Sequence, residues 1–407
     1  MRSRRILVAL GVAVGLLVAG CGSDGPDPAA QRTAETPAGA PSGATPSAPA
    51  GAAPSSGHGT GQPRATTSAP PLRAGEELRR VAMPAGYLPR APNGATDDYR
   101  CFLLDPKVTR DSFVTGYDVV PGDVSVVHHV ILYRVPADKV RLARAQDART
   151  PGDGWTCFGG TGIEQQGASL DDAPWVGAWA PGGTARLLDA DLGIPVEKGS
   201  RIVLQVHYNL LHGAKPDRTA VDLRLSTSSR LSPLETVLYP APVELPCRDG
   251  RSGRLCDREA ALWDVGARFG RRAAATVAGL QLLCNGSFEP EPGPTQSCTR
   301  TVGEAATVRS AAGHMHLLGS SIRIELNAGT ATARTLLDVE QWDFDDQAAR
   351  RVRPTKVRPG DRITVTCTHD QAWRDRLPAL QGVPDRYVVW GEGTTDEMCL
   401  GILGVTR

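Results

Sequence analysis

Short apolar or alternating segments, separated by turn residues, dominate most of the chain. Two of them, residues 124–135 and 201–208, are dense in Val, Ile and Leu. Two others, residues 321–326 and 357–368, contain apolar residues that alternate with polar ones. Because strand side chains point alternately to opposite faces, these patterns predict β-strands with one or both faces buried.

Turn signals and a single helical pattern complete the prediction for the folded region. Pro-Gly and Gly-Asp pairs recur between the apolar segments and indicate tight turns. Helical periodicity is confined to residues 257–270, so we expect an all-β fold built as sandwiches or barrels. A polar stretch at residues 226–229 separates two comparable halves. We therefore expect one domain over residues 76–228 and a second over residues 229–407.

The first residues have the features of a bacterial lipoprotein signal. Three arginines precede an apolar run over residues 6–19, which is too short to span a bilayer comfortably. Small residues then precede Cys21, where a lipobox would be cleaved and lipidated. We expect residues 1–21 to direct export and Cys21 to anchor the protein to the outer face of a bacterial cell membrane or the periplasmic face of an outer membrane. An ordinary signal peptide with a chance cysteine is the alternative.

Composition separates a linker from the folded region. Residues 22–75 are almost wholly Ala, Pro, Ser, Gly and Thr, and cannot bury enough apolar surface to offset the entropy of ordering. We expect a disordered linker there, followed by enough chain for two domains with cores of their own. The formal net charge of +1 gives no reason to expect a nucleic-acid partner. We expect a monomer.

Cysteine usage indicates an oxidising compartment. Nine cysteines are present, and eight remain when Cys21 is set aside. An even number in an exported chain without a C-x-x-C pattern favours disulfides over thiolate metal sites. The cysteine positions alone leave every pairing open.

Histidines fall into two tight groups beside predicted strands. His314 and His316 are two positions apart, so on a strand both imidazoles would share a face and reach one ion. His128 and His129 are adjacent and can share an ion only where the strand is twisted, bulged or ends. His207 ends another predicted strand.

Each of these histidines has an alternative role as a hydrogen-bonded core residue. Paired imidazoles are costly to bury without a metal, which favours a metal at His314 and His316, whereas His207 alone favours the core role. His212 and His369 are expected to bind no metal. Imidazole sites suit zinc or copper, and a thioether ligand favours copper. An exported chain with two histidine groups is thus a copper candidate, while spacing alone leaves Met398 in the core.

At these residues the chain resembles the copper type II, ascorbate-dependent monooxygenases, which include peptidylglycine α-hydroxylating monooxygenase and dopamine β-monooxygenase. The resemblance covers roughly residues 98–403 and consists of four segments in the family's order, which are more specific together than singly. The segments are V-H-H-V-I-L-Y at residues 127–133, L-Q-V-H-Y at residues 204–208, H-M-H-L-L-G at residues 314–319 and T-D-E-M-C at residues 395–399.

The resemblance implies two antiparallel β-sandwich domains of the jelly-roll kind, each with one copper. By position, the ligands of the first copper would be His128, His129 and His207. Those of the second copper, which binds O2 beside the substrate, would be His314, His316 and Met398. The resemblance also implies the disulfides Cys101–Cys157 and Cys367–Cys399. For the other four cysteines, proximity in sequence then suggests Cys247–Cys256 and Cys284–Cys298.

The implied activity is hydroxylation of a C–H bond in a small or exposed organic substrate, with O2 and ascorbate or another one-electron reductant. Peptide-amidating members have an Arg two positions before the H-x-H segment, where this chain has Ala312. Their Asn and Tyr after the Met correspond to Leu400 and Ile402, so we do not expect peptide amidation. The stretch 240–300 is longer than in the animal enzymes.

Two other classes of function are consistent with the same residues. The first is a non-catalytic lipoprotein of the cell envelope that binds, stores or delivers copper. The second is an adhesion or binding module of the sandwich kind with incidental histidines.

Overall fold

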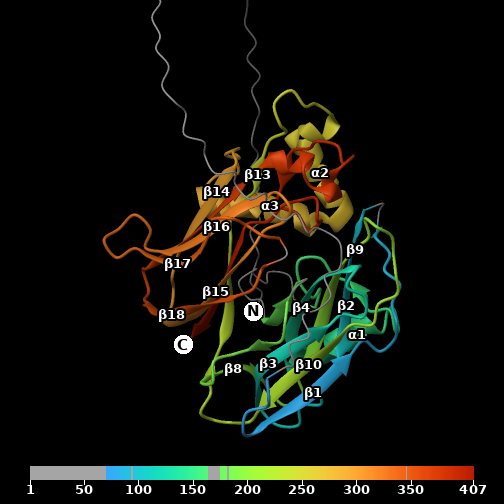
Figure 1. Ribbon diagram of the computed structural model, residues 1–407, viewed down its shortest axis with the longest axis vertical. Helices are drawn as coiled ribbons and strands as arrows, with labels where there is room; N and C mark the ends of the chain where they lie inside the picture. Colours follow the sequence, from blue (N-terminus) through green and yellow to red (C-terminus); the bar gives the residue numbers. More distant parts are fainter. Residues whose placement is uncertain (1–69, 93–94, 164–174, 181–182, 345) are drawn as a thin grey trace, which may run out of the picture. The chain divides into compact units, whose positions relative to one another are not determined.

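Strands, nearly all paired antiparallel, are the main regular secondary structure of this computed structural model, which describes residues 70–92, 95–163, 175–180, 183–344 and 346–407. The expected signal peptide with Cys21 and nearly all of the expected linker lie outside the described residues. In Figure 1 the earlier strands are blue to green and the later ones orange to red. The expectation of a mainly β fold is confirmed.

Two sheets are formed by the first half of the described chain. One has the order β1-β10-β3-β8-β11, with β7 paired to β3. Its strands are β1 (Glu76–Ala82), β3 (Ser112–Val120), β7 (Arg186–Leu187), β8 (Leu192–Val196), β10 (Ala220–Ser226) and β11 (Ser232–Pro233). The other has the order β5-β2-β9-β4-β6. Its strands are β2 (Asp97–Leu104), β4 (Val127–Val135), β5 (Trp155–Thr156), β6 (Trp175–Trp179) and β9 (Arg201–Asn209).

The second half forms two four-stranded sheets and a short ribbon. One sheet has the order β12-β21-β15-β18 and the other β14-β19-β16-β17. The strands of the first are β12 (Glu235–Pro240), β15 (Ala306–His314), β18 (Arg350–Val357) and β21 (Leu400–Thr406). Those of the second are β14 (Thr295–Thr301), β16 (Gly319–Leu326), β17 (Arg334–Val339) and β19 (Arg362–His369). The ribbon pairs β13 (Glu244–Leu245) with β20 (Val388–Val389).

Each pair of large sheets shares an apolar core. In the first pair, Leu223 of β10 and Leu204 of β9 are fully buried in one cluster. In the second pair, Val308 of β15 and Val365 of β19 belong to a separate cluster. Strand β9 is buried along nearly its whole length because its other face is covered too, by a small cluster that includes residues of α1 (Val140–Asp147).

Two helices interrupt the β architecture within the long stretch at residues 240–300. The expected helix is confirmed as α2 (Arg258–Phe269), which begins where the Asp257 carboxylate accepts a hydrogen bond from the Ala260 amide at 2.8 Å. A second helix, α3 (Arg271–Asn285), follows at once and was not expected. Its alanine-rich first turns have high helix propensity, which was the overlooked signal.

Four disulfides join the expected cysteine pairs, namely Cys101–Cys157, Cys247–Cys256, Cys284–Cys298 and Cys367–Cys399. Disulfides persist in oxidising compartments, so this set indicates an extracytoplasmic protein. Among the described residues, no helix is both long enough and apolar enough to cross a membrane.

Removing the disulfide between Cys367 and Cys399 is expected to destabilise the protein. A double Ala variant should lose about 2–4 kcal/mol of unfolding free energy, because the unfolded chain gains freedom, and urea denaturation measures this loss. The matched control replaces Cys247 and Cys256, which are 9 residues apart rather than 32, and should lose less. An equal or greater loss in the control would contradict the expectation.

Candidate metal centre

A β-bulge allows His128 and His129 to face the same point. Val127 of β4 pairs with Tyr208 of β9, and His129 pairs with His207, so two steps along β4 face one step along β9. The additional residue of a bulge bends the strand and redirects its side chains. The irregularity that the adjacent histidines require is therefore present.

Three imidazole nitrogens converge at this bulge. The Nδ1 atom of His207 lies 3.0 Å from that of His128 and 3.3 Å from that of His129, and the last two are 3.2 Å apart. Metal–nitrogen bonds of about 2.0–2.1 Å would separate such ligands by roughly 3.3–3.6 Å. A proton can serve only one pair of these nitrogens, whereas a central cation satisfies all three. The three side chains therefore fit a metal ion.

Burial keeps these imidazoles in the form that binds metal. His207 is fully buried and His128 is 8 % exposed. Desolvation, followed by the charge of the neighbouring imidazoles, holds the pKa values of His128 and His129 well below the usual value. Neutral imidazoles present a lone pair, so they can bind an ion without first losing a proton.

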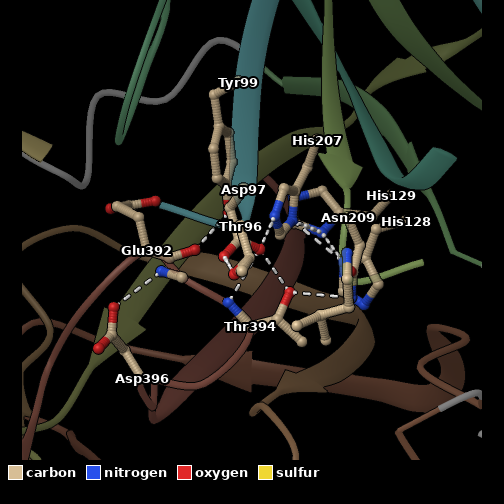
Figure 2. A network of polar contacts seen from close by, with 12 residues as sticks. Thr96, Asp97, Tyr99, His128, His129, His207, Asn209, Glu392, Thr394 and Asp396 are labelled. Carbon is tan, nitrogen blue, oxygen red and sulfur yellow. Dashed lines mark hydrogen bonds and ion pairs between the residues drawn. The ribbon is translucent and has the colours of Figure 1, made fainter. Parts of the chain in front are cut away.

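Asp97 orients His207 from the side away from the cluster. The Nε2 atom of His207 donates to Asp97 Oδ1 at 2.8 Å, which leaves Nδ1 free to bind an ion (Figure 2). Burial alone would raise the pKa of Asp97, but hydrogen bonds from His207, Thr394 and Thr96 bring it well below the usual range. Asp97 is therefore a carboxylate.

Aromatic rings fix the orientation of two of the imidazoles. Tyr99 stacks on His207 with centroids 4.0 Å apart, and Phe344 stacks on His128 at 4.7 Å. The Tyr99 hydroxyl donates to the Glu392 backbone oxygen at 2.7 Å, which holds its ring in place. These contacts restrict the positions of the nitrogens before any ion binds.

The second histidine group lies where β15 ends. His314 is the last residue of that strand, His316 follows in the turn, and their ring centroids are 5.2 Å apart. His314 Nδ1 donates to Gln347 Oε1 at 2.6 Å, and His316 Nδ1 donates to the Asp396 backbone oxygen at 3.1 Å. Both Nε2 atoms are thus free to bind an ion, and that of His316 is buried without a partner among the described residues. Burial lowers the pKa of His314 to about 3.

Met398 belongs to a segment that is attached to the turn carrying His316. The Glu397 carboxylate accepts hydrogen bonds from the backbone amides of His316 at 2.9 Å and Leu318 at 2.6 Å. Met398 is 7 % exposed and lines the same cavity as His314. The cavity lining therefore includes the imidazole of His314 and the thioether of Met398, while His316 contacts the His314 ring without lining the cavity.

The two histidine groups are neighbours. The rings of His129 and His314 meet edge to face with centroids 5.9 Å apart, and both residues line a cavity of about 910 Å³. Of the other histidines, His212 is exposed, and His369 Nε2 lies 3.3 Å from the Glu397 carboxylate. His369 therefore has an acidic partner at this nitrogen.

A hydrogen-bonded link joins the first group to the Met398 segment. The Thr394 hydroxyl and backbone amide donate to Asp97 Oδ1 at 2.6 and 3.2 Å, so one carboxylate oxygen holds both His207 and a residue four positions before Met398 (Figure 2). The sequence analysis missed both Asp97 and Thr394. Their only signal was position, since Asp97 begins the strand that pairs with His207 and Thr394 precedes the D-E-M-C segment.

Replacing Thr394 by Val should weaken metal binding at the three-histidine group. The change removes a hydrogen-bond donor to Asp97 with little change of side-chain shape. Mutation of a residue that bonds a metal ligand directly typically lowers metal affinity by roughly 10- to 100-fold. Thr394 is one contact further out, so we expect its loss to lower the metal affinity by roughly 3- to 10-fold. Competition of Zn²⁺ between the protein and a chromophoric chelator measures the affinity. Thr394→Ser should restore binding, and Thr395→Val is the control. Equal affinities for the wild type and the Thr394→Val and Thr395→Val variants would contradict a role for Thr394.

Comparisons with known proteins do not identify the chain. It matches no protein-family model and no curated protein. Solved structures similar to parts of it include an allantoicase at 12 % identity and a TM-score of 0.17, covering 75 % of this chain and 80 % of that one. The allantoicase of Saccharomyces cerevisiae has 9 % identity, a TM-score of 0.17 and coverages of 78 % and 80 %. The VP2 subviral particle of infectious bursal disease virus has 7 % identity and a TM-score of 0.19, and the match covers 82 % of this chain and 72 % of that one. Likenesses this weak carry no functional argument.

Proposed function

We propose that this chain is a copper-dependent monooxygenase of the cell envelope that hydroxylates a C–H bond of an organic substrate. The observation that carries the proposal is the convergence of the Nδ1 atoms of His128, His129 and His207 within 3.3 Å of one another. Beside them lies a second histidine pair, of which His314 lines the same cavity as Met398. In this proposal two antiparallel β-sandwich domains of the jelly-roll kind each hold one copper.

The donor atoms favour copper over zinc. A site of three imidazoles suits either ion, but a site of two imidazoles and a thioether matches the soft ligands that copper prefers, especially as Cu(I). His314, His316 and Met398 would hold this second ion, and three protein ligands leave positions open for a small molecule. Four disulfides support export to an oxidising compartment, where a lipid anchor on Cys21 would retain the protein.

Bound copper would supply one-electron transfer and the reduction of O2. The surrounding residues have supporting roles: Asp97 orients His207, Gln347 orients His314, and the apolar cavity keeps water from the substrate. The contact between His129 and His314 at 5.9 Å supports electron transfer from one group to the other over a short distance.

The overall reaction balances with a one-electron reductant such as ascorbate. One oxygen atom of O2 is inserted into the substrate C–H bond, and the other leaves as water. Two electrons and two protons are consumed, so two molecules of ascorbate each lose one electron for every hydroxylated product.

Three positions in the cavity wall argue against peptide amidation as the activity. Ala312 of β15 pairs with Ile402 of β21, and both residues line the cavity together with Leu400. These three positions offer no cation to hold a peptide carboxylate and no hydroxyl or amide to orient it. A carboxylate buried against them would lose its hydration without gaining a partner.

Replacing Met398 by Ala should abolish ascorbate-driven oxygen uptake and leave copper at the three-histidine group. The thioether is expected to be a ligand of the second ion only, so the bound copper should fall from two ions per chain towards one. The control is Met315→Leu, a volume-conserving change of a fully buried core thioether that should preserve both properties. Oxygen uptake that survives Met398→Ala would contradict the assignment of the second site.

Turnover separates the enzyme from a copper carrier. The wild type with copper and ascorbate should consume O2 and release a hydroxylated product from at least one member of a panel of substrates. Two bound coppers per chain without turnover on any member would indicate instead a lipoprotein that binds, stores or delivers copper.

A further inference from the structure

A helical hairpin makes part of the wall of the cavity. The lining of the 910 Å³ space contains His129, His314 and Met398. It also contains Phe269, the last residue of α2, together with residues of the first two turns of α3. A molecule that fills this cavity would therefore contact both the candidate metal ligands and the α2–α3 hairpin.

The hairpin presents one face of α3 to the cavity. Arg272, Ala273 and Thr276 line it, and residues three or four positions apart share a helix face. Gly270, with φ of 91°, is the single residue between α2 and α3 and makes the turn that lets α3 begin at Arg271. This spacing lets α3 present an alanine methyl, a threonine side chain and an arginine to the cavity.

Ion pairs and ring contacts fix the hairpin to the site. The Arg268 guanidinium donates hydrogen bonds to both carboxylate oxygens of Asp396, at 2.8 and 2.6 Å, and Asp396 lies two residues before Met398. It also donates a hydrogen bond to Asp264 at 2.8 Å. The Phe269 ring meets Phe158 edge to face at 5.0 Å. A wall held in this way can discriminate between ligands by shape, because it cannot yield without breaking these contacts.

The chemistry of the lining indicates an uncharged ligand. Phe158, Trp175 and Phe269 supply aromatic surface, and Ala312, Leu400 and Ile402 supply aliphatic surface. Two arginines and two acidic residues line the cavity, so their formal charges cancel: Arg186, Arg272, Asp346 and Glu392. The volume lies within the range of about 300–1,000 Å³ that is typical of sites for drug-sized molecules.

We propose that the α2–α3 hairpin determines substrate specificity, and that the cavity takes an uncharged, hydrocarbon-rich organic molecule whose reactive carbon lies towards His314 and Met398. The position of the reactive carbon rests on the proposed function, whereas binding of the molecule in the cavity does not depend on it. Burial of such a molecule against aromatic and aliphatic walls is favourable in proportion to the apolar area removed from water, whereas a fixed charge would lose hydration there.

Ligand binding tests the proposal on the full folded protein without added metal. The uncharged fluorophore N-phenyl-1-naphthylamine should bind at a single saturable site. Ala273→Trp fills the cavity and should weaken this binding at least tenfold. Ala275→Trp is the matched control, because Ala275 is exposed on the same helix and does not line the cavity, and it should bind as the wild type does. Equal binding by both variants would overturn the role of the hairpin.

Displacement of the fluorophore tests the ligand class. The competitors 1-decanol, decanoate and decylammonium share one chain and differ in charge, and 1-decanol should displace at the lowest concentration. Stronger displacement by decanoate would indicate recognition by Arg272 or Arg186, and stronger displacement by decylammonium would indicate recognition by Glu392 or Asp346. Either result would overturn the assignment of an uncharged ligand.

Two further measurements separate this proposal from the proposed function. Zn²⁺ binding by both tryptophan variants should equal that of the wild type, which shows that the fold and metal ligands survive. Oxygen uptake that fails in a protein with intact fluorophore binding would contradict the monooxygenase, not the cavity. If the Ala273→Trp variant keeps both its oxygen uptake and its fluorophore binding, the role of the hairpin is contradicted and the proposed function is not.

Discussion

The mutual approach of three buried imidazoles is the constraint on which the rest of the structure depends. Lone pairs of His128, His129 and His207 within 3.3 Å of one another repel unless a cation lies among them. The fold holds them there through a bulge in β4, a carboxylate behind His207 and stacked rings on two sides. Such restraint is costly in entropy and is consistent with a site shaped in advance for an ion.

The same contacts join the two halves of the described chain. Asp97 accepts hydrogen bonds from His207 and from Thr394, although Thr394 lies 297 positions after Asp97 in the sequence. Phe344, from the second half, lies on His128, and Gln347 three residues later holds His314. Changes around one histidine group therefore reach the other through short, specific contacts. The proposed monooxygenase would need such a connection to coordinate electron transfer with substrate binding.

Much of the β architecture could be predicted because strand periodicity is a local property. The segments around His128 and His207 became β4 and β9, and the disulfide pairs followed from resemblance and proximity. The bulge at His128 and His129 could be named only as one condition for their sharing an ion, because the register of a strand depends on its partner strand. Asp97 and Thr394 could not be found, since a polar residue shows its role only when distant segments meet. The helix α3 was missed although its composition favoured it.

The most direct test of the central claim is anomalous X-ray diffraction at the copper edge from crystals of the copper-loaded protein. The account predicts one copper peak surrounded by the Nδ1 atoms of His128, His129 and His207, at about 2.0 Å from each. It predicts a second peak between the Nε2 atoms of His314 and His316 and the sulfur of Met398. Copper bound elsewhere, with these imidazoles left without metal, would contradict the account.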